Sequence, residues 1–320
     1  MQIINIHHPY QTDDIYPDDI VLVLGFFDGI HRGHQEVINK GIKIAKERGI
    51  KCAVMTFNRH PAFVYRRFDP DTHTYLTPLD RKEDIMRRLG VDILYEVDFT
   101  ARFGNLPPQQ FVDDYIVGWH AKVVVAGFDY TYGKADKANM KTLPGYAKNR
   151  FEIVTVEKKE FQNDKISSTR IRRYISEGKV AEANELLGYL YEISGFVIHG
   201  DARGRELGYP TANIYPHPYI MVPKRGIYAV KLKVNNEWID GMASIGYNPT
   251  FGHRPSYSIE VHLFNFKEDI YGEDVRVKWV DYLRDEIKFN SADELIQRLE
   301  QDELESKEIL SNVTLNKLDY

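Results

Sequence analysis

Two histidines and an aspartate stand among glycines in GFFDGIHRGH (25–34), directly after the apolar run VLVL. His31 and His34 can donate hydrogen bonds to phosphate oxygens when suitably protonated. Gly25 lets the backbone approach a ligand closely, and the N-terminus of a following helix favours an anion. These residue types indicate a phosphate cradle without the lysine of a P-loop. A glycine-rich turn with incidental histidines and a metal site, for which no third ligand is evident, remain alternatives at this point.

A second segment with phosphate-binding chemistry is ISSTRIRRYI (166–175). Ser168 and Thr169 place hydroxyls at an expected helix start, where backbone N–H groups and the helix dipole favour an anion. Arg172 could neutralise a phosphate. Taken alone, the segment is more typical of an N-cap followed by a basic, solvated helix face.

Oxygen ligands and a carboxylate occur together in the last third of the chain. In the PTAN that ends GDARGRELGYPTAN (200–213), Thr211 and Asn213 point to the same side of an extended segment. A hydroxyl and an amide oxygen are hard ligands suited to Mg²⁺ on ATP phosphates. In SIEVHLF (258–264), the alternation turns Glu260 away from the apolar neighbours. Glu260 is therefore either a solvent-facing residue or a base for an attacking alcohol.

The first half of the chain alternates strand-like and helix-like segments, which must position the first two motifs. Short apolar runs predict strands over 21–26, 52–57, 92–97, 121–128 and 151–156. Helical periodicity between them includes 77–90, with Thr77 as N-cap, Pro78 as the first residue and Gly90 as the stop. It also includes 107–119, whose predicted inward residues are Phe111, Val112, Tyr115, Ile116 and Trp119. The alternation predicts a parallel sheet in a doubly wound α/β domain, whose ligands bind at the carboxyl ends of the strands.

The pattern changes near residue 188. Five strand-like segments follow with turns between them, which predicts an antiparallel sheet or a small barrel. A last helix begins at Ser291, with Glu294 at capping-box spacing. We expect two domains, residues 1–186 and 187–320.

Composition excludes several classes of protein. The net charge is −5 with acids and bases mixed, which does not support a nucleic-acid or membrane surface. Cys52 is the only cysteine, so a disulfide within the chain and a cysteine-rich metal site are impossible. We expect neither a signal peptide nor a membrane span, and therefore a cytoplasmic location.

The motifs of the first half, in this order, resemble those of a known enzyme module. GFFDGIHRGH, the HP of TFNRHP (56–61), AGFDYTYGK (126–134) and ISSTRIR are similar to the FMN adenylyltransferase module of bacterial bifunctional riboflavin kinase/FAD synthetases. The resemblance implies a Rossmann-like nucleotidyltransferase fold, in which His31, His34 and Arg172 serve catalysis. It implies an ATP site formed by Gly25, Asp28, His31, His34, Asp129, Ser168, Thr169 and Arg172.

The second half resembles the riboflavin kinase module of the same family. GDARGRELGYPTAN, GIYAV, IGYNPTF, IEVHLF, DIYGE and LRDEIKF occur in the expected order. The resemblance implies that Glu260 is the catalytic base and that Thr211 and Asn213 hold Mg²⁺ with ATP. It implies a nucleotide and flavin site formed by Gly200, Arg203, Gly204, Gly208, Thr211, Asn213 and Arg284.

Together the two resemblances imply a chain that phosphorylates riboflavin to FMN and then adenylylates FMN to FAD, using ATP in both steps. No nucleic-acid or membrane partner is expected, and the oligomeric state is left open. Two departures concern FMN adenylylation: Arg59 where proline is common, and KADKANM (134–140), with Ala138 where glycine is common. They keep two alternatives open: one active module only, or a flavin-binding regulatory or storage protein.

Overall fold

The computed structural model describes residues 1–65, 74–161, 164–200, 203–248 and 256–319. Contacts within the chain divide it into two compact units. The first contains Met1–His73 and Thr77–Ser167, and the second contains Thr74–Leu76 and Ser168–Tyr320. The domain boundary after residue 186 stays a prediction.

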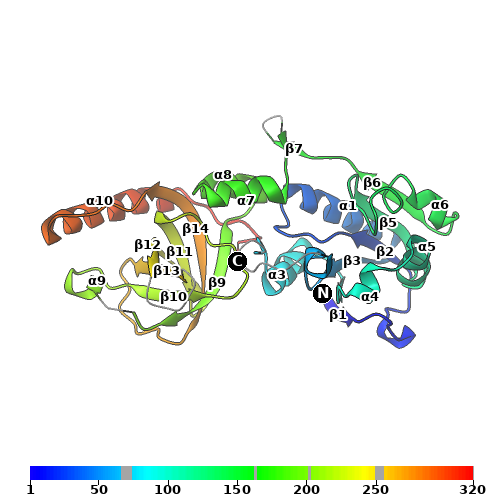
Figure 1. Cartoon of the computed structure of the whole chain (residues 1–320), viewed down its shortest axis with the longest axis horizontal. Coiled ribbons are helices and arrows are strands. Elements are labelled where there is room, and N and C mark those ends of the chain that lie inside the picture. Colours follow the sequence, from blue (N-terminus) through cyan, green and yellow to red (C-terminus); the bar gives the residue numbers. More distant parts are fainter. Residues whose placement is uncertain (66–73, 162–163, 201–202, 249–255, 320) are drawn as a thin grey trace. The chain divides into compact units, whose positions relative to one another are not determined.

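The first unit is built on a six-stranded parallel sheet, as the alternating pattern predicts (Figure 1). Its strands lie in the order β1-β4-β3-β2-β5-β6. Their bounds are β1 (Gln2–Ile6), β2 (Ile20–Leu24), β3 (Lys51–Phe57), β4 (Ile93–Val97), β5 (Ala121–Gly127) and β6 (Glu152–Val156). A separate antiparallel pair contains β7 (Glu160–Phe161) and β8 (Asp164–Lys165).

Helical segments connect these strands. They are η1 (Thr12–Asp14), α1 (Arg32–Arg48), α2 (Ala62–Tyr65), α3 (Leu79–Leu89), α4 (Ala101–Gly104), α5 (Pro108–Phe111), the π-helical η2 (Val112–Val117) and α6 (Leu143–Ala147). Helix α1 packs on β2, β3 and β5. The approach is close, because a Cβ on Gly41 of α1 would lie 2.3 Å from Val23 Cγ2. This packing fixes the start of α1 at the carboxyl end of β2.

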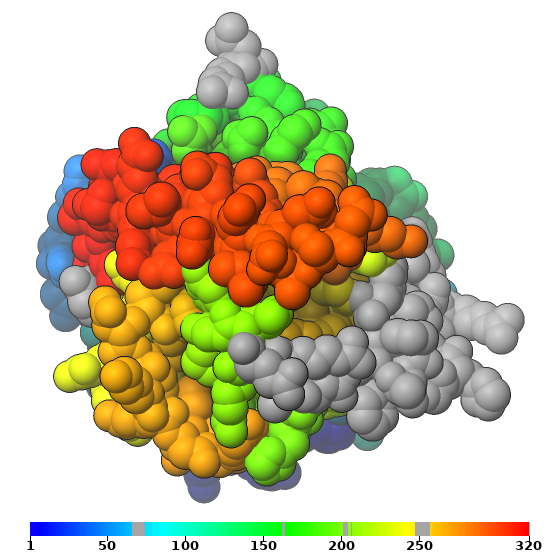
Figure 2. All heavy atoms as spheres, turned by 90° about the vertical axis from the view of Figure 1, so that its left-hand side faces the viewer, coloured from blue at the N-terminus to red at the C-terminus, as the bar shows by residue number. Residues whose placement is uncertain are grey.

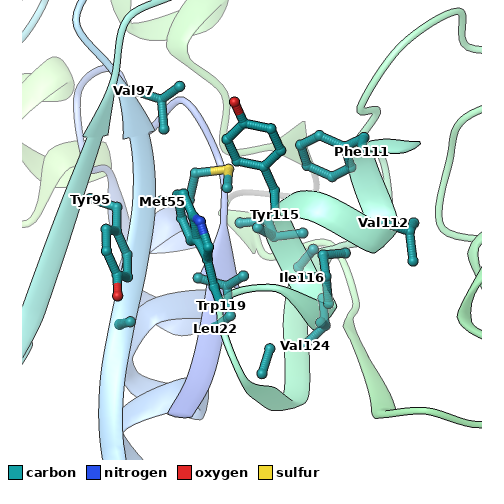
Figure 3. Packing of buried hydrophobic residues seen from close by; sticks show 14 of the residues in the cluster. Leu22, Met55, Tyr95, Val97, Phe111, Val112, Tyr115, Ile116, Trp119 and Val124 are labelled. Atoms are coloured by element: carbon teal, nitrogen blue, oxygen red, sulfur yellow. The ribbon is translucent and has the colours of Figure 1, made fainter. Parts of the chain in front are cut away.

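Residues 107–119 cover part of the sheet with large apolar side chains. The five predicted inward residues, Phe111, Val112, Tyr115, Ile116 and Trp119, are all buried. The Trp119 ring centroid lies 4.1 Å from that of Tyr95 on β4 (Figure 3). The segment is not one regular α-helix, because α5 continues directly into the π-helical η2.

Two expectations for the first unit need correction. Strand β1 was not predicted from the sequence, and it pairs in parallel with β4 from Gln2↔Ile93 to Ile6↔Val97. Thr77 is not the N-cap of α3; Pro78 occupies that position, and the Thr77 hydroxyl has another partner. The predicted stop at Gly90 is confirmed, with a left-handed φ of 98°.

The second unit contains a closed antiparallel barrel, which confirms the barrel prediction. Its strand order is β10-β13-β12-β11-β14-β9. The strands are β9 (Tyr191–Ile198), β10 (Ala212–Pro216), β11 (Gly226–Val234), β12 (Glu237–Asn248), β13 (Ser256–Leu263) and β14 (Asp274–Arg284). The helices are α7 (Ser168–Ser176), α8 (Val180–Leu187), α9 (Arg203–Glu206) and α10 (Ala292–Ser311). Helix α10 packs on β11, β12 and β14 and crosses one face of the unit (Figure 2).

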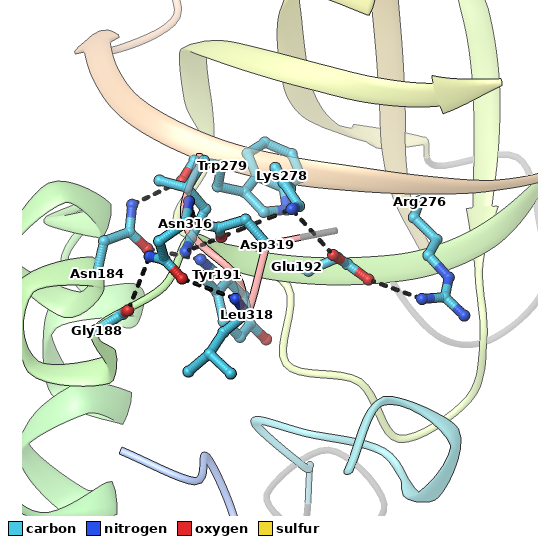
Figure 4. A network of polar contacts seen from close by, with 11 residues as sticks. Asn184, Gly188, Tyr191, Glu192, Arg276, Lys278, Trp279, Asn316, Leu318 and Asp319 are labelled. Carbon is cyan, nitrogen blue, oxygen red and sulfur yellow. Dashed lines mark hydrogen bonds and ion pairs between the residues drawn. The ribbon is translucent and has the colours of Figure 1, made fainter. Parts of the chain in front are cut away.

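A buried ionic cluster ties the end of the chain to the barrel (Figure 4). The ammonium of Lys278, a fully buried residue, lies 3.8 Å from a Glu192 carboxylate oxygen and 3.6 Å from one of Asp319. Asp319 also accepts the backbone N–H of Leu190 at 2.8 Å. The segment after α10 therefore closes over the start of β9. Within the described parts of the chain, no helix combines the length and apolar character needed to cross a membrane.

Candidate functional site

The GFFDGIHRGH segment forms a strained turn between β2 and α1. Phe27 and Ile30 have positive φ angles of 55° and 30°, unusual for bulky side chains, and Gly29 has φ 85°. A Cβ on Gly25 would lie 2.5 Å from the Phe27 ring, so the absence of a side chain lets that ring fold back. The turn ends at His31, which is the N-cap of α1.

His31 and His34 lie face to face at this helix start. Their ring centroids are 3.6 Å apart with planes 19° from parallel, and His31 Nδ1 accepts the backbone N–H of His34 at 3.2 Å. Burial, helped by the Lys165 ammonium, lowers the pKa of His31 to about 4. Burial and the neighbouring His31 also lower the pKa of His34. Both rings are therefore neutral near pH 7, and the acceptor role of His31 Nδ1 leaves the proton on Nε2.

Polar groups from more distant sequence hold the turn from inside the unit. The Lys82 ammonium donates to Phe26 O at 2.9 Å and to Thr56 Oγ1 at 3.0 Å, and Thr56 Oγ1 donates to Phe26 O at 2.9 Å. Burial lowers the pKa of Lys82 to about 8. Sequence reasoning missed Lys82, because its charge on a predicted helix gives no signal of burial. Its buried position supports the turn beneath the candidate ATP site.

Asp28 is buried, and its carboxylate accepts the backbone N–H of Thr77 at 3.1 Å. The Thr77 hydroxyl accepts the backbone N–H of Gly29 at 2.7 Å. Asp28 therefore binds the backbone of Thr77, and Thr77 binds the backbone of the residue that follows Asp28. The structure places Asp28 in the wall of the turn, held by a residue 49 positions away in the sequence.

Asp129 follows β5 at the same carboxyl edge of the sheet and forms an ion pair with Lys165. The Lys165 charge is among the causes that lower the pKa of both histidines, so this cation lies near them. A Cβ on Gly33 would lie 3.9 Å from Ile166 O, which places the segment before α7 beside the start of α1. The first unit thus brings together the histidine turn, Asp129 and Lys165. Lys165 was not predicted, although its position directly before ISST was an available signal.

The predicted residues Ser168, Thr169 and Arg172 begin α7, which groups with the second unit. Arg172 donates to the backbone carbonyl of Thr74 at 2.6 Å. The combined action of these residues with the two histidines stays a prediction.

In the second unit, strand pairing brings the PTAN segment to the predicted base. Asn213 of β10 lies opposite Glu260 of β13 in the antiparallel register. Thr211 Oγ1 donates to Glu260 Oε2 at 3.3 Å, and Ser258 Oγ donates to Glu260 Oε1 at 3.2 Å. Ile259 and Val261 are buried as the alternation predicts. A hydroxyl, an amide and a carboxylate therefore share one patch of the barrel wall.

The glycines of GDARGRELGYPTAN let the loop fold closely on itself. A Cβ on Gly200 would lie 2.2 Å from Asn213 Nδ2, and one on Gly204 would lie 2.2 Å from Tyr209 O. Gly208 has a left-handed φ of 85°. The side chain of Arg203, also predicted for this site, lies outside the described part of the structure.

A pocket of about 370 Å³ opens beside Thr211. Its walls come from the start of β10, from β13 and from residues 266–271 after β13. Arg205 and Lys267 supply positive charge, and Tyr271 stacks on His199 with ring centroids 3.8 Å apart. The DIYGE motif runs along one side of this pocket, so the predicted motif residues share it with Thr211.

Arg284 lies at the end of β14 and is engaged by α10. Its Nε donates to Asp302 Oδ1 at 2.9 Å, and its NH1 donates to Asp285 O at 3.0 Å. Arg298 also pairs with Asp302 at 2.8 Å, and the Asp302 side chain is fully buried between the two arginines. The structure thus places Arg284 in an ionic contact that attaches α10 to the barrel. Its predicted role toward the flavin is not tested by this contact.

Comparisons with known proteins match both halves of the chain. The family model for FAD synthetase matches residues 14–170, and the one for riboflavin kinase matches residues 187–310. A bifunctional riboflavin kinase/FMN adenylyltransferase of Listeria monocytogenes is 50% identical over 96% of this chain and 98% of its own length. One of the same description from Bacillus subtilis is 44% identical over 98% and 99%. A solved structure described as a macrolide-efflux protein from Streptococcus pneumoniae is 40% identical, with a TM-score of 0.89 over 97% of this chain and all of its own.

The two family models match the chain in the predicted order, FAD synthetase first and riboflavin kinase second. The high identity extends over nearly the full length of each relative. The chain belongs to the family of bifunctional riboflavin kinases/FMN adenylyltransferases.

Proposed function

We propose that this chain makes FAD from riboflavin in two ATP-dependent steps, at two sites. The C-terminal unit phosphorylates riboflavin to FMN, and the N-terminal unit adenylylates FMN to FAD. The observation that carries the proposal is the register of β10 with β13, which sets Thr211 Oγ1 3.3 Å from Glu260 Oε2 and Asn213 opposite Glu260. Pure flavin storage would not require a carboxylate beside hard oxygen ligands.

In the kinase step, Glu260 accepts the proton of the terminal ribityl hydroxyl of riboflavin. The hydroxyl oxygen forms a bond to the γ-phosphorus of ATP, and the bond from that phosphorus to the β,γ-bridging oxygen breaks. ADP is the leaving group, and FMN is the product. Catalysis is then mainly a matter of positioning and electrostatics, with Glu260 orienting the alcohol. Hydrogen bonds from Thr211 and Ser258 hold the two carboxylate oxygens in place.

The donor set suits Mg²⁺, which prefers hard oxygen ligands. Thr211 would hold the ion through its hydroxyl and Asn213 through its amide oxygen, with the Glu260 carboxylate nearby. When bound, Mg²⁺ supplies neutralisation of charge on the ATP phosphates. The side chain of Asn213 is confined by Gly200, which supports a fixed position for its oxygen.

The pocket beside Thr211 has the properties needed for the nucleotide of ATP. Its volume of about 370 Å³ falls in the range of small-molecule sites. Val197 and Ile270 supply apolar wall, while Arg205 and Lys267 supply cationic groups. We assign the ATP of the kinase reaction to this pocket, with its phosphates directed to Thr211.

In the adenylyl transfer, a phosphate oxygen of FMN forms a bond to the α-phosphorus of a second ATP. The bond from that phosphorus to the α,β-bridging oxygen breaks, and pyrophosphate leaves. No general base is needed, because the attacking phosphate is already anionic. His31 donates through Nε2–H, and Lys165 and Arg172 offer positive charge to the phosphates. An anion at the turn also raises the pKa of both histidines, so ATP favours their protonated forms.

Purified chain supplied with riboflavin, ATP and Mg²⁺ should form FMN and then FAD, separated by chromatography. Glu260→Gln should abolish FMN formation and leave the conversion of supplied FMN to FAD intact. Glu237→Gln, the same chemical change at an exposed hairpin position, is the matched control and should retain both activities. His31→Ala should do the reverse of Glu260→Gln.

Each outcome separates the proposal from its alternatives. Absence of any flavin product would end the enzyme proposal and favour a binding protein. FMN without FAD would leave only the kinase module active. Loss of both activities in Glu260→Gln, with the fold retained, would refute the assignment of the two steps to separate sites.

Both steps consume ATP, which fits a cytoplasmic location.

A further inference from the structure

Thr77 stands where the chain passes from one compact unit to the other. Residues Thr74–Leu76 group with the second unit, and Thr77 groups with the first. Leu76 and Thr77 are both buried. We call Thr74–Thr77 the strap.

The first part of the strap is fixed by backbone pairing. Tyr75 N–H donates to Tyr219 O at 2.6 Å, and Met221 N–H donates to Tyr75 O at 3.1 Å, as in a parallel bridge between Tyr75 and Ile220. Arg172 donates to Thr74 O at 2.6 Å. Three hydrogen bonds from the second unit therefore end within three residues of Thr77.

The last residue of the strap holds the histidine turn. The Thr77 hydroxyl accepts Gly29 N–H at 2.7 Å, and Thr77 N–H donates to Asp28 Oδ1 at 3.1 Å. These contacts fall between Phe27 and Ile30, the two bulky residues with positive φ. Positive φ angles in bulky residues persist only where surrounding groups fix them. His31 directly follows Ile30, so the same groups also fix where His31 begins. Thr77 therefore holds the turn that leads directly into His31.

We infer that Thr77 is a positioning residue for adenylyl transfer. The inference rests on the proposed function, because it concerns the FAD-forming site. A segment outside the quoted motifs thus has a task of its own.

The hydroxyl is tested in the full chain with Thr77→Val and Thr77→Ser, measuring FAD formation from supplied FMN and ATP. Valine keeps the size and removes the acceptor of Gly29 N–H, so kcat should fall about tenfold. KM for FMN should change less, because substrate contacts are retained. Serine restores the acceptor and should return kcat to within about threefold of the natural chain. FMN formation from riboflavin should be unchanged in both variants.

Two results would overturn the inference. They are a natural rate of FAD formation in Thr77→Val, and equal impairment of Thr77→Val and Thr77→Ser. A natural chain that makes no FAD would instead refute the proposed function. The two failures are therefore distinguishable in one set of assays.

Discussion

Gly200→Ala offers a test of the kinase site that removes none of its chemical groups. The added Cβ would lie 2.2 Å from Asn213 Nδ2 and 2.5 Å from Asn213 Oδ1. Ordinary contact begins at 3.4 Å, so the amide must retreat by roughly 1.2 Å. No positive φ restricts Gly200, so the variant adds a clash without backbone strain. The cheapest relief is rotation of the Asn213 side chain, which removes its oxygen from the proposed Mg²⁺ position.

A displacement of about 1 Å in a catalytic constellation costs on the order of 100-fold in rate, or about 2.7 kcal/mol of transition-state stabilisation. We therefore expect kcat/KM for FMN formation to fall about 100-fold, with a higher Mg²⁺ requirement and an almost unchanged melting temperature. FMN-to-FAD conversion should be unaffected. Gly145→Ala is the control, because a Cβ added there would have nothing within 4 Å of it. FMN formation at the natural rate in Gly200→Ala would refute the role of the Asn213 amide.

Three further predictions concern buried charge. Asp302→Ala leaves the Arg284 guanidinium without its carboxylate, so the free energy of unfolding of the second unit should fall by about 3 kcal/mol in denaturant titrations; a loss below about 1 kcal/mol would contradict this. Acid should destabilise the first unit, because the unfolded chain binds a proton at His31 between its ordinary pKa of 6.5 and its folded pKa of about 4. The neutral, buried His31 therefore costs the first unit about 3 kcal/mol of its free energy of unfolding as the pH falls from 6.5 to 4. The melting temperature of His31→Gln should depend less steeply on pH. Lys82→Met removes one of the two side-chain donors to Phe26 O and should slow FAD formation several-fold with FMN formation unchanged, as product chromatography would show.

Periodicity predicted most of the elements because burial of one face is a local property of the sequence. The five inward residues of 107–119 are an example, since their spacing needs only one helical face toward the sheet. The same spacing does not distinguish an α-helix from the π-helical turn found at Val112–Val117. Strand β1 gives a weaker signal, because only Ile6 of its five residues is fully buried. A partly exposed strand lacks the continuous apolar run that identified β2.

The chemical groups of both sites could be predicted from residue type, but their partners could not. Threonine before proline at a helix start is typical of an N-cap, so Thr77 carries no local sign that its hydroxyl binds Gly29. Lys82 on a predicted amphipathic helix is typical of a solvated residue. Its burial follows from the position of α3 beneath the turn, which only the assembled unit determines.

The two sites share a construction that explains why some of their determinants lack a chemical signature. Each joins a glycine-containing segment to a group about fifty positions away: Thr77 lies 48 residues from Gly29, and Glu260 lies 49 residues from Thr211. Glycine allows the backbone of this segment to adopt a tight conformation, and the distant group then fixes that conformation. Reactivity therefore resides in groups such as the Glu260 carboxylate, whereas distance is set by residues such as Thr77 and Gly200 that react with nothing. Substituting Thr77 should therefore slow FAD formation, and substituting Gly200 should slow FMN formation, although every residue with a chemical role is retained.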